Sequence, residues 1–165
     1  MRACVVALNA VERRLVTLCE HWVDFRSDVS KRLLVWQLLD DSMRLAHAFF
    51  EMQKYEVPYA SGDVFIAFST PFEHSAQYAR DLKRSLSGRY DASRGDLAGE
   101  GLHADWASPE LPDTPRGAIQ CFGSMGSAYH RTIGHLALVL MPATVCDSTM
   151  FSGWVFRALA VGLPE

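Results

Sequence analysis

A surplus of basic residues is missing from this sequence, which has 16 lysines and arginines against 19 aspartates and glutamates and a net charge of −3. Domains that bind DNA or RNA usually carry a basic patch or stripe, so this charge balance argues against a nucleic acid as partner. No apolar run approaches the roughly 20 residues needed to cross a membrane. The apolar start of the chain is preceded only by Arg2 and is followed by no small-residue cleavage site, which argues against a signal peptide. We therefore expect a cytoplasmic protein that binds neither nucleic acid nor membrane.

Motifs for phosphate binding, metal binding and nucleophilic catalysis are also missing. The chain contains no GxxxxGK[ST], GxGxxG or HExxH motif. The stretch GSMGS at residues 123–127 differs in order from the nucleophile elbow GxSxG, and it precedes a predicted strand instead of following one. We predict no cofactor, no metal site and no catalytic residue. The sequence leaves enzymatic activity open and favours a protein without it.

The four cysteines are scattered, and none forms a CxxC pair: Cys4, Cys19, Cys121 and Cys146. Scattered cysteines in an intracellular chain usually serve as small apolar core residues. We therefore expect free thiols rather than disulfides.

A helix that begins near residue 10 is the best-specified element. Asn9 can act as its N-cap, and Glu12 follows at the capping-box spacing. Apolar residues spaced by four and three positions predict one continuous stripe along it: Val11, Leu15, Leu18, Trp22 and Phe25. This stripe can face either the domain's own sheet or a partner.

Three short apolar runs predict strands at residues 33–39, 64–69 and 135–141. A helical pattern follows each run, and this repeated strand–helix order is typical of βαβ units. We predict an α/β fold, a three-layer sandwich with a short, mainly parallel sheet of about three strands flanked by helices. The amphipathic helix described above is added at the N-terminal end.

Helix-start signals follow the second and third predicted strands. After the second strand, Thr70 can cap a helix that has Pro71 in its first turn and Glu73 completing a capping box. After the third strand, Asp147 or Ser148 can cap the last helix.

The length of 165 residues fits a single α/β domain over residues 1–165. Glycines and prolines crowd residues 89–117, which we predict to be an irregular excursion, with Gly88 weakening or ending the helix before it. Pro115 can open a further helix towards Tyr129. Because three strands are few for this fold class, the chain is either a complete small sandwich or the N-terminal part of a longer protein.

Residues 62–69 (GDVFIAFS) and 78–86 (YARDLKRSL) resemble the opening strand and helix of Toll/interleukin-receptor domains. That family places this segment at its start and follows the helix closely with a second strand and a proline-glycine loop. Here residues 1–61 precede the segment, and a polar, glycine-rich stretch follows it. No glutamate maps to the family's catalytic position, since Glu73 is explained by capping. We therefore do not assign the chain to that family.

Acidic and hydroxyl side chains follow the carboxyl ends of the predicted strands, where open parallel sheets bind their ligands. They form a candidate ligand-binding crescent: Asp40, Asp41, Ser69, Thr70, Thr144 and Asp147. The alternative is that each of them is a helix cap, since caps are expected at these positions whatever the function. Adjacent carboxylates after the first predicted strand would repel a phosphate.

Aromatic residues are abundant for so small a sheet, with four tryptophans, nine phenylalanines and five tyrosines. We expect those that the core cannot bury to form a partner-binding surface, with Trp22, Phe25 and Trp106 as candidates. The leading hypothesis is a non-catalytic protein–protein interaction or adaptor domain whose partner is another protein or domain. The alternative is a degenerate nucleotide- or small-ligand-binding domain, NTPase-like or hydrolase-like, with its site at the strand ends.

Overall fold

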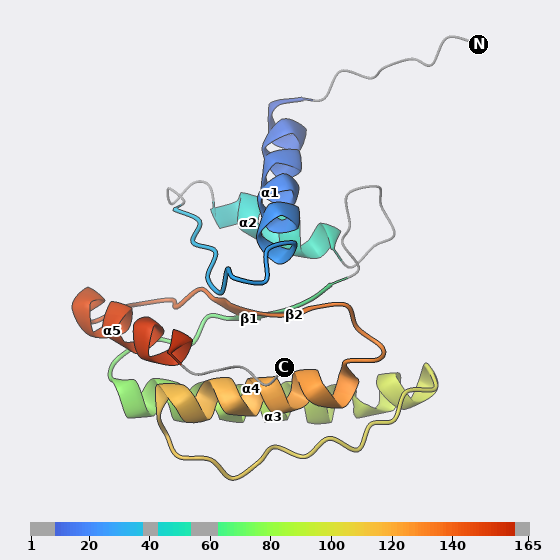
Figure 1. Cartoon of the computed structure of the whole chain (residues 1–165), viewed down its shortest axis with the longest axis vertical. Coiled ribbons are helices and arrows are strands. Elements are labelled where there is room, and N and C mark those ends of the chain that lie inside the picture. Colours follow the sequence, from blue (N-terminus) through green and yellow to red (C-terminus); the bar gives the residue numbers. More distant parts are fainter. Residues whose placement is uncertain (1–8, 38–42, 54–62, 161–165) are drawn as a thin grey trace. The chain divides into compact units, whose positions relative to one another are not determined.

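The computed structural model describes residues 9–37, 43–53 and 63–160 (Figure 1). The chain divides into two compact units, residues 1–64 and residues 65–165. They are called the N-terminal unit and the C-terminal unit below. The single domain expected over residues 1–165 stays a prediction.

The first helix of the N-terminal unit, α1 (Ala10–Arg26), starts as the sequence predicts. The Asn9 side chain accepts hydrogen bonds from the backbone N–H groups of Val11 and Glu12, each at 2.9 Å. In return, the Glu12 carboxylate accepts the backbone N–H of Asn9 at 2.7 Å. This reciprocal capping box satisfies donors that would otherwise have no partner at a helix N-terminus.

The second helix, α2 (Met43–Met52), packs against α1. The predicted stripe on α1 is buried at Leu18 and Trp22, but its first member, Val11, is 58% exposed. From α2, Ala46 and Phe49 are buried. The two helices therefore share a small apolar core at the C-terminal end of α1.

The predicted first strand is wrong for the part of it that the structure describes. Residues 33–37 form no strand, and they follow α1 as irregular chain. Leu33 and Val35 are 45% and 72% exposed, and the Trp36 ring meets the Phe49 ring edge-on at 5.0 Å. Leu33 and Val35 thus face water, whereas Trp36 packs on α2. The run therefore covers a helix instead of pairing in a sheet. Residues 38–39 of the predicted strand lie outside the described residues.

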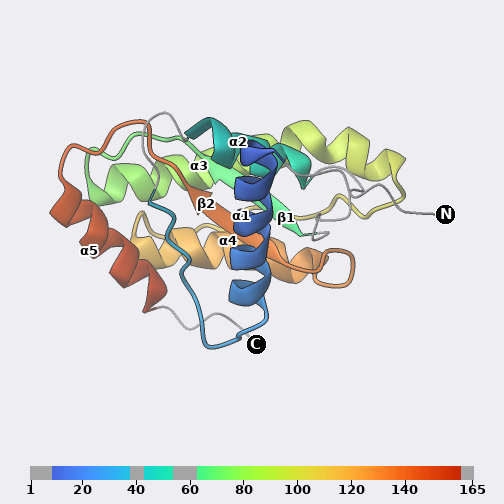
Figure 2. The same ribbon diagram turned by 90° about the horizontal axis from the view of Figure 1, so that it is seen from above.

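The C-terminal unit contains a sheet of two neighbouring strands, β1 (Val64–Phe68) and β2 (Leu136–Leu140). Both strands lie within the predicted ranges. The pairing is parallel and continues beyond the strands through a bridge between Phe72 and Val145. Helices α3 (Ser75–Gly99) and α4 (Pro115–Tyr129) run side by side along one face of the sheet, with α5 (Ser148–Leu159) at one end (Figures 1 and 2).

Helix α3 (Ser75–Gly99) differs from its prediction at both ends. It begins after the N-cap His74, not at Thr70, because Phe72 is held extended by its bridge to Val145. It also continues through Gly88, since Leu86 and Tyr90 on either side of that glycine are buried in the core and hold the helix in place. The irregular excursion is therefore shorter than residues 89–117, and it covers residues 100–114.

Helices α4 (Pro115–Tyr129) and α5 (Ser148–Leu159) start where the sequence predicts. Pro115 occupies the first turn of α4 behind the N-cap Thr114, and Asp147 caps α5. A Cβ atom at Gly117 would lie 2.1 Å from the carbonyl oxygen of Pro112, so only glycine allows the excursion to pass this close to α4.

The core of the C-terminal unit lies between the sheet and its helices. Its largest fully buried side chains are aromatic: Trp154, Tyr78, Phe68 and Phe72. Ile66, Leu138 and Leu140 reach this core from the two strands.

The chain thus combines helices with a short parallel sheet, which agrees with the predicted α/β class. In residues 9–37, 43–53 and 63–160 the sheet has two strands instead of three. Among those residues, no helix is long and apolar enough to span a membrane.

Candidate functional site

The strand-end crescent is assembled in part. The amide of Ala143 donates to the carbonyl of Ser69 at 3.0 Å, and the amide of Phe72 donates to the carbonyl of Thr144 at 2.9 Å. Ser69, Thr70 and Thr144 therefore lie on two neighbouring segments at the carboxyl edge of the sheet. The carbonyl groups of Ser69 and Thr144 are already used in hydrogen bonds between these segments. Asp40 and Asp41 lie outside the described residues.

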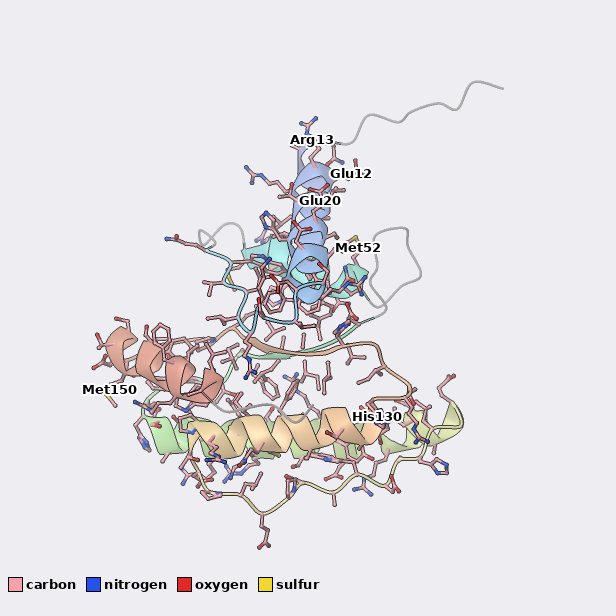
Figure 3. All side chains as sticks on the ribbon, in the orientation of Figure 1. Glu12, Arg13, Glu20, Met52, His130 and Met150 are labelled. Atoms are coloured by element: carbon pink, nitrogen blue, oxygen red, sulfur yellow. The ribbon has the colours of Figure 1, made fainter. Side chains whose placement is uncertain are left out.

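Asp147 has the capping role that the sequence offers as the alternative to ligand binding. One of its carboxylate oxygens accepts the backbone N–H of Met150 at 2.9 Å. Met150 itself is 47% exposed and projects outward from α5 (Figure 3). The carboxylate of Asp147 thus stabilises the first turn of α5.

Trp22, a predicted partner-binding residue, is buried in the N-terminal unit. Its indole N–H donates to the Asp63 carboxylate at 2.7 Å, and the Arg26 guanidinium contacts the same oxygen at 3.0 Å. The Asp63 side chain is 1% exposed, so these two donors compensate a charge that would be costly to bury alone. Trp22 therefore supports the fold of this unit, and the predicted partner surface must rest on its neighbours.

An apolar groove lies beside this cluster, between α1 and residues 31–37. We call it the α1 groove. It has a volume of about 510 Å³ and is lined by apolar side chains and a few polar ones: Leu18, His21, Asp24, Phe25, Lys31, Leu33, Leu34, Val35, Trp36 and Gln37. Phe25, the second predicted partner-binding residue, is half-buried there with its ring 5.6 Å from that of Trp22.

The polar side of α1 borders the groove at His21 and Asp24. Glu12, Arg13 and Glu20 are exposed and project from α1 (Figure 3). The sequence identified Phe25 as a surface candidate but missed Leu33 and Val35. The run at residues 33–37 is apolar apart from Gln37, so its composition alone does not separate the exposed Leu33 and Val35 from the half-buried Leu34 and Trp36.

Trp106, the third predicted partner-binding residue, is buried in the C-terminal unit. Its backbone N–H donates to the Tyr90 hydroxyl at 2.9 Å, and its indole N–H donates to the Ser124 hydroxyl at 3.1 Å. The Tyr90 and Trp106 rings meet edge-on at 4.9 Å. The excursion is thus anchored to α3 and α4 by a core tryptophan rather than carrying that tryptophan on its surface.

A second set of contacts holds the other end of the excursion. The Lys83 ammonium donates to the carbonyls of Leu111 and Pro112, and it pairs with the Asp113 carboxylate at 2.9 Å. The lysine side chain is 13% exposed. These contacts hold the excursion on α3, although the excursion forms no strand or helix.

Two polar atoms in the aromatic core have no hydrogen-bond partner in the described part of the chain, the Tyr78 hydroxyl and the Trp154 indole nitrogen. The two rings meet edge-on at 5.0 Å, and both side chains are fully buried. Burial raises the pKa of the Tyr78 hydroxyl above its usual value. Tyr78 therefore remains protonated and acts as a packing residue.

No cluster of three or more histidine, cysteine or acidic side chains that could hold a metal ion occurs in residues 9–37, 43–53 and 63–160. No protein-family model matches the chain, and the searches of curated proteins and of solved structures found no match either.

Proposed function

We propose that the chain is a protein-binding module whose α1 groove takes up an apolar segment of a partner protein. The observation that carries this proposal is the exposure of apolar side chains along one wall of the groove. Leu33 is 45% exposed and Val35 is 72% exposed. Contiguous apolar surface of this kind is typical of interaction sites.

The partner segment that fits this groove is short and apolar, with charged flanks. A volume of about 510 Å³ accommodates a few large side chains. The aromatic side of the groove, with Phe25 and Trp36, suits anchors from an amphipathic helix, which usually inserts residues from one face. Asp24 and Lys31 at the groove supply one charge of each sign for the polar flanks.

Site-specific crosslinking tests the proposal. A photoreactive residue is placed at Val35 in the full chain, and a matched one is placed at Val29, which is 97% exposed and does not line the groove. We expect a defined partner crosslinked from Val35 and not from Val29, and we expect loss of its capture in Val35→Asp but not in Val29→Asp. Equal capture by both variants would reject the groove as the binding site.

The free thiols support an intracellular location for this module. Cys19 and Cys121 are buried and unpaired, and Cys146 is exposed and unpaired. Exposed free thiols persist in reducing compartments and are rare in oxidising ones. We therefore propose that the module acts in the cytoplasm.

A further inference from the structure

We propose that two copies of this chain associate through the outer edge of β2, the edge that faces away from β1. The two copies would form one continuous sheet with the strand order β1–β2–β2–β1. This edge belongs to the C-terminal unit, and its pairing does not depend on the α1 groove.

The hydrogen-bonding directions of β2 follow from one backbone hydrogen bond to β1. The amide of Met141 donates to the carbonyl of Phe68 at 2.8 Å, so the backbone of Met141 faces β1. Because backbone groups alternate in direction along a strand, those of Ala137 and Val139 also face β1. The groups of Leu136, Leu138 and Leu140 therefore point to the outer edge, where no further strand is paired among the described residues.

Within β2 itself, this outer edge carries neither a charged side chain nor a proline, two features that normally prevent edge pairing. The sequence of β2 is LALVL, which has no charge and no proline. Leu138 and Leu140 pack against the core but remain only half-buried. An added strand would cover the outward backbone groups of β2 and further area of these side chains.

The outer edge of β1, in contrast, is blocked by a charged side chain of α3. The backbone carbonyl of Ala67 points away from β2, since its neighbour Phe68 faces β2. Arg89 from α3 donates to this carbonyl at 2.6 Å, and its guanidinium lies 5.0 Å from the centre of the Phe68 ring. A charged side chain at this position blocks strand addition. Because each copy then has only one edge that can pair, association through that edge ends in a closed dimer rather than a fibre.

A second copy fits this edge by its own symmetry. Antiparallel pairing about Leu138 places Leu138 opposite its own copy and Leu136 opposite Leu140, so all the outward backbone groups find complementary partners. The leucine side chains of the two copies then contact each other on the face of the sheet that packs against the core. The resulting sheet has enough strands for independent stability, whereas two strands alone are marginal.

Sedimentation of the full chain, with a matched pair of proline variants, tests the dimer. Leu138→Pro removes an outward N–H from β2, and Ala67→Pro removes an outward N–H from β1, so both changes spare the hydrogen bonds between β1 and β2. We expect wild type and Ala67→Pro to sediment at twice the chain mass of 18.4 kDa. We expect Leu138→Pro to sediment as a monomer. A monomeric wild type, a dimeric Leu138→Pro or open-ended wild-type polymers would overturn the proposal.

Amide hydrogen exchange of the wild-type chain gives a second readout, which decides the matter if Leu138→Pro fails to fold. In the dimer, the amides of Leu136, Leu138 and Leu140 are as protected as those of Ala137 and Val139, and dilution below the dissociation constant exposes them. Fast exchange at the three leucines in concentrated protein would overturn the proposal. Protection of the same amides in a monomer, or by a co-purified peptide, would overturn it as well, because the strand on β2 would then not be a second copy.

Discussion

The hydroxyl groups of Tyr90 on α3 and Tyr129 on α4 lie 2.7 Å apart, and Tyr90 is the donor. This direction follows because Tyr129 donates its single proton to the carbonyl of His103 at 2.9 Å. Tyr90 in turn accepts the backbone N–H of Trp106. The two hydroxyls therefore join two helices to two points of the excursion and order residues that have no regular structure of their own.

The Tyr129 hydroxyl makes stability depend on pH in the alkaline range. Burial raises the pKa of Tyr129 from 10.0 to about 12. Between these values the unfolded chain is ionised at this residue and the folded chain is not, so raising the pH favours unfolding. The stability due to the neutral hydroxyl is complete below pH 10 and is lost as the pH rises to about 12.

Denaturant unfolding of wild type and Tyr129→Phe at a series of pH values measures this contribution. At neutral pH we expect the variant to be less stable by about 1 kcal/mol, because Tyr90 loses its acceptor and His103 loses a donor. The difference should shrink above pH 10, since only the wild type loses stability by ionisation at residue 129. A difference that stays constant up to pH 12 would contradict the assigned cause of the shift.

Tyr78→Phe should have the opposite effect on stability. The Tyr78 hydroxyl is buried with no hydrogen-bond partner in the described part of the chain. Its removal keeps the ring and its edge-on contact with Trp154. We expect a gain of about 1 kcal/mol in the free energy of unfolding, measured by denaturant titration. A loss of similar size would show that the hydroxyl has a partner such as a buried water.

Asp63→Asn tests the buried cluster of the N-terminal unit. The amide has nearly the same shape as the carboxylate but lacks its charge, so the contact with Arg26 is weakened while the Trp22 indole keeps an acceptor. We expect a loss of about 2 kcal/mol in the free energy of unfolding, together with a change in Trp22 fluorescence. Asp28→Asn is the matched control, because Asp28 pairs with Lys31 at 3.7 Å on the surface. A loss no larger than that of the control would contradict a structural role for Asp63.

Local sequence signals were sufficient to predict several element starts. The side chains of Asn9 and Glu12 satisfy the same helix terminus that they were predicted to cap. Pro115 and Asp147 likewise mark the starts of α4 and α5. These signals act within one turn of the chain, so no knowledge of the tertiary structure is needed to read them.

Tertiary contacts decided the elements for which two local interpretations compete. An apolar run such as residues 33–37 suits either a buried strand or a cover for a helix, and the contact between Trp36 and Phe49 selects the second. Thr70 has the composition of an N-cap, but the pairing of Phe72 with Val145 holds this segment extended and moves the start of α3 to Ser75.

The sequence by itself determined the α/β class, the two strands of the sheet and most helix starts, because periodicity and capping are short-range properties. Only the tertiary structure decided which aromatic residues are buried. Trp22 and Trp106 were candidates for a surface, but Asp63 and Ser124 accept the hydrogen bonds of their indole N–H groups and let both indoles enter a core. Those partners lie far from the tryptophans in sequence, and folding brings them together through packing that no local pattern encodes.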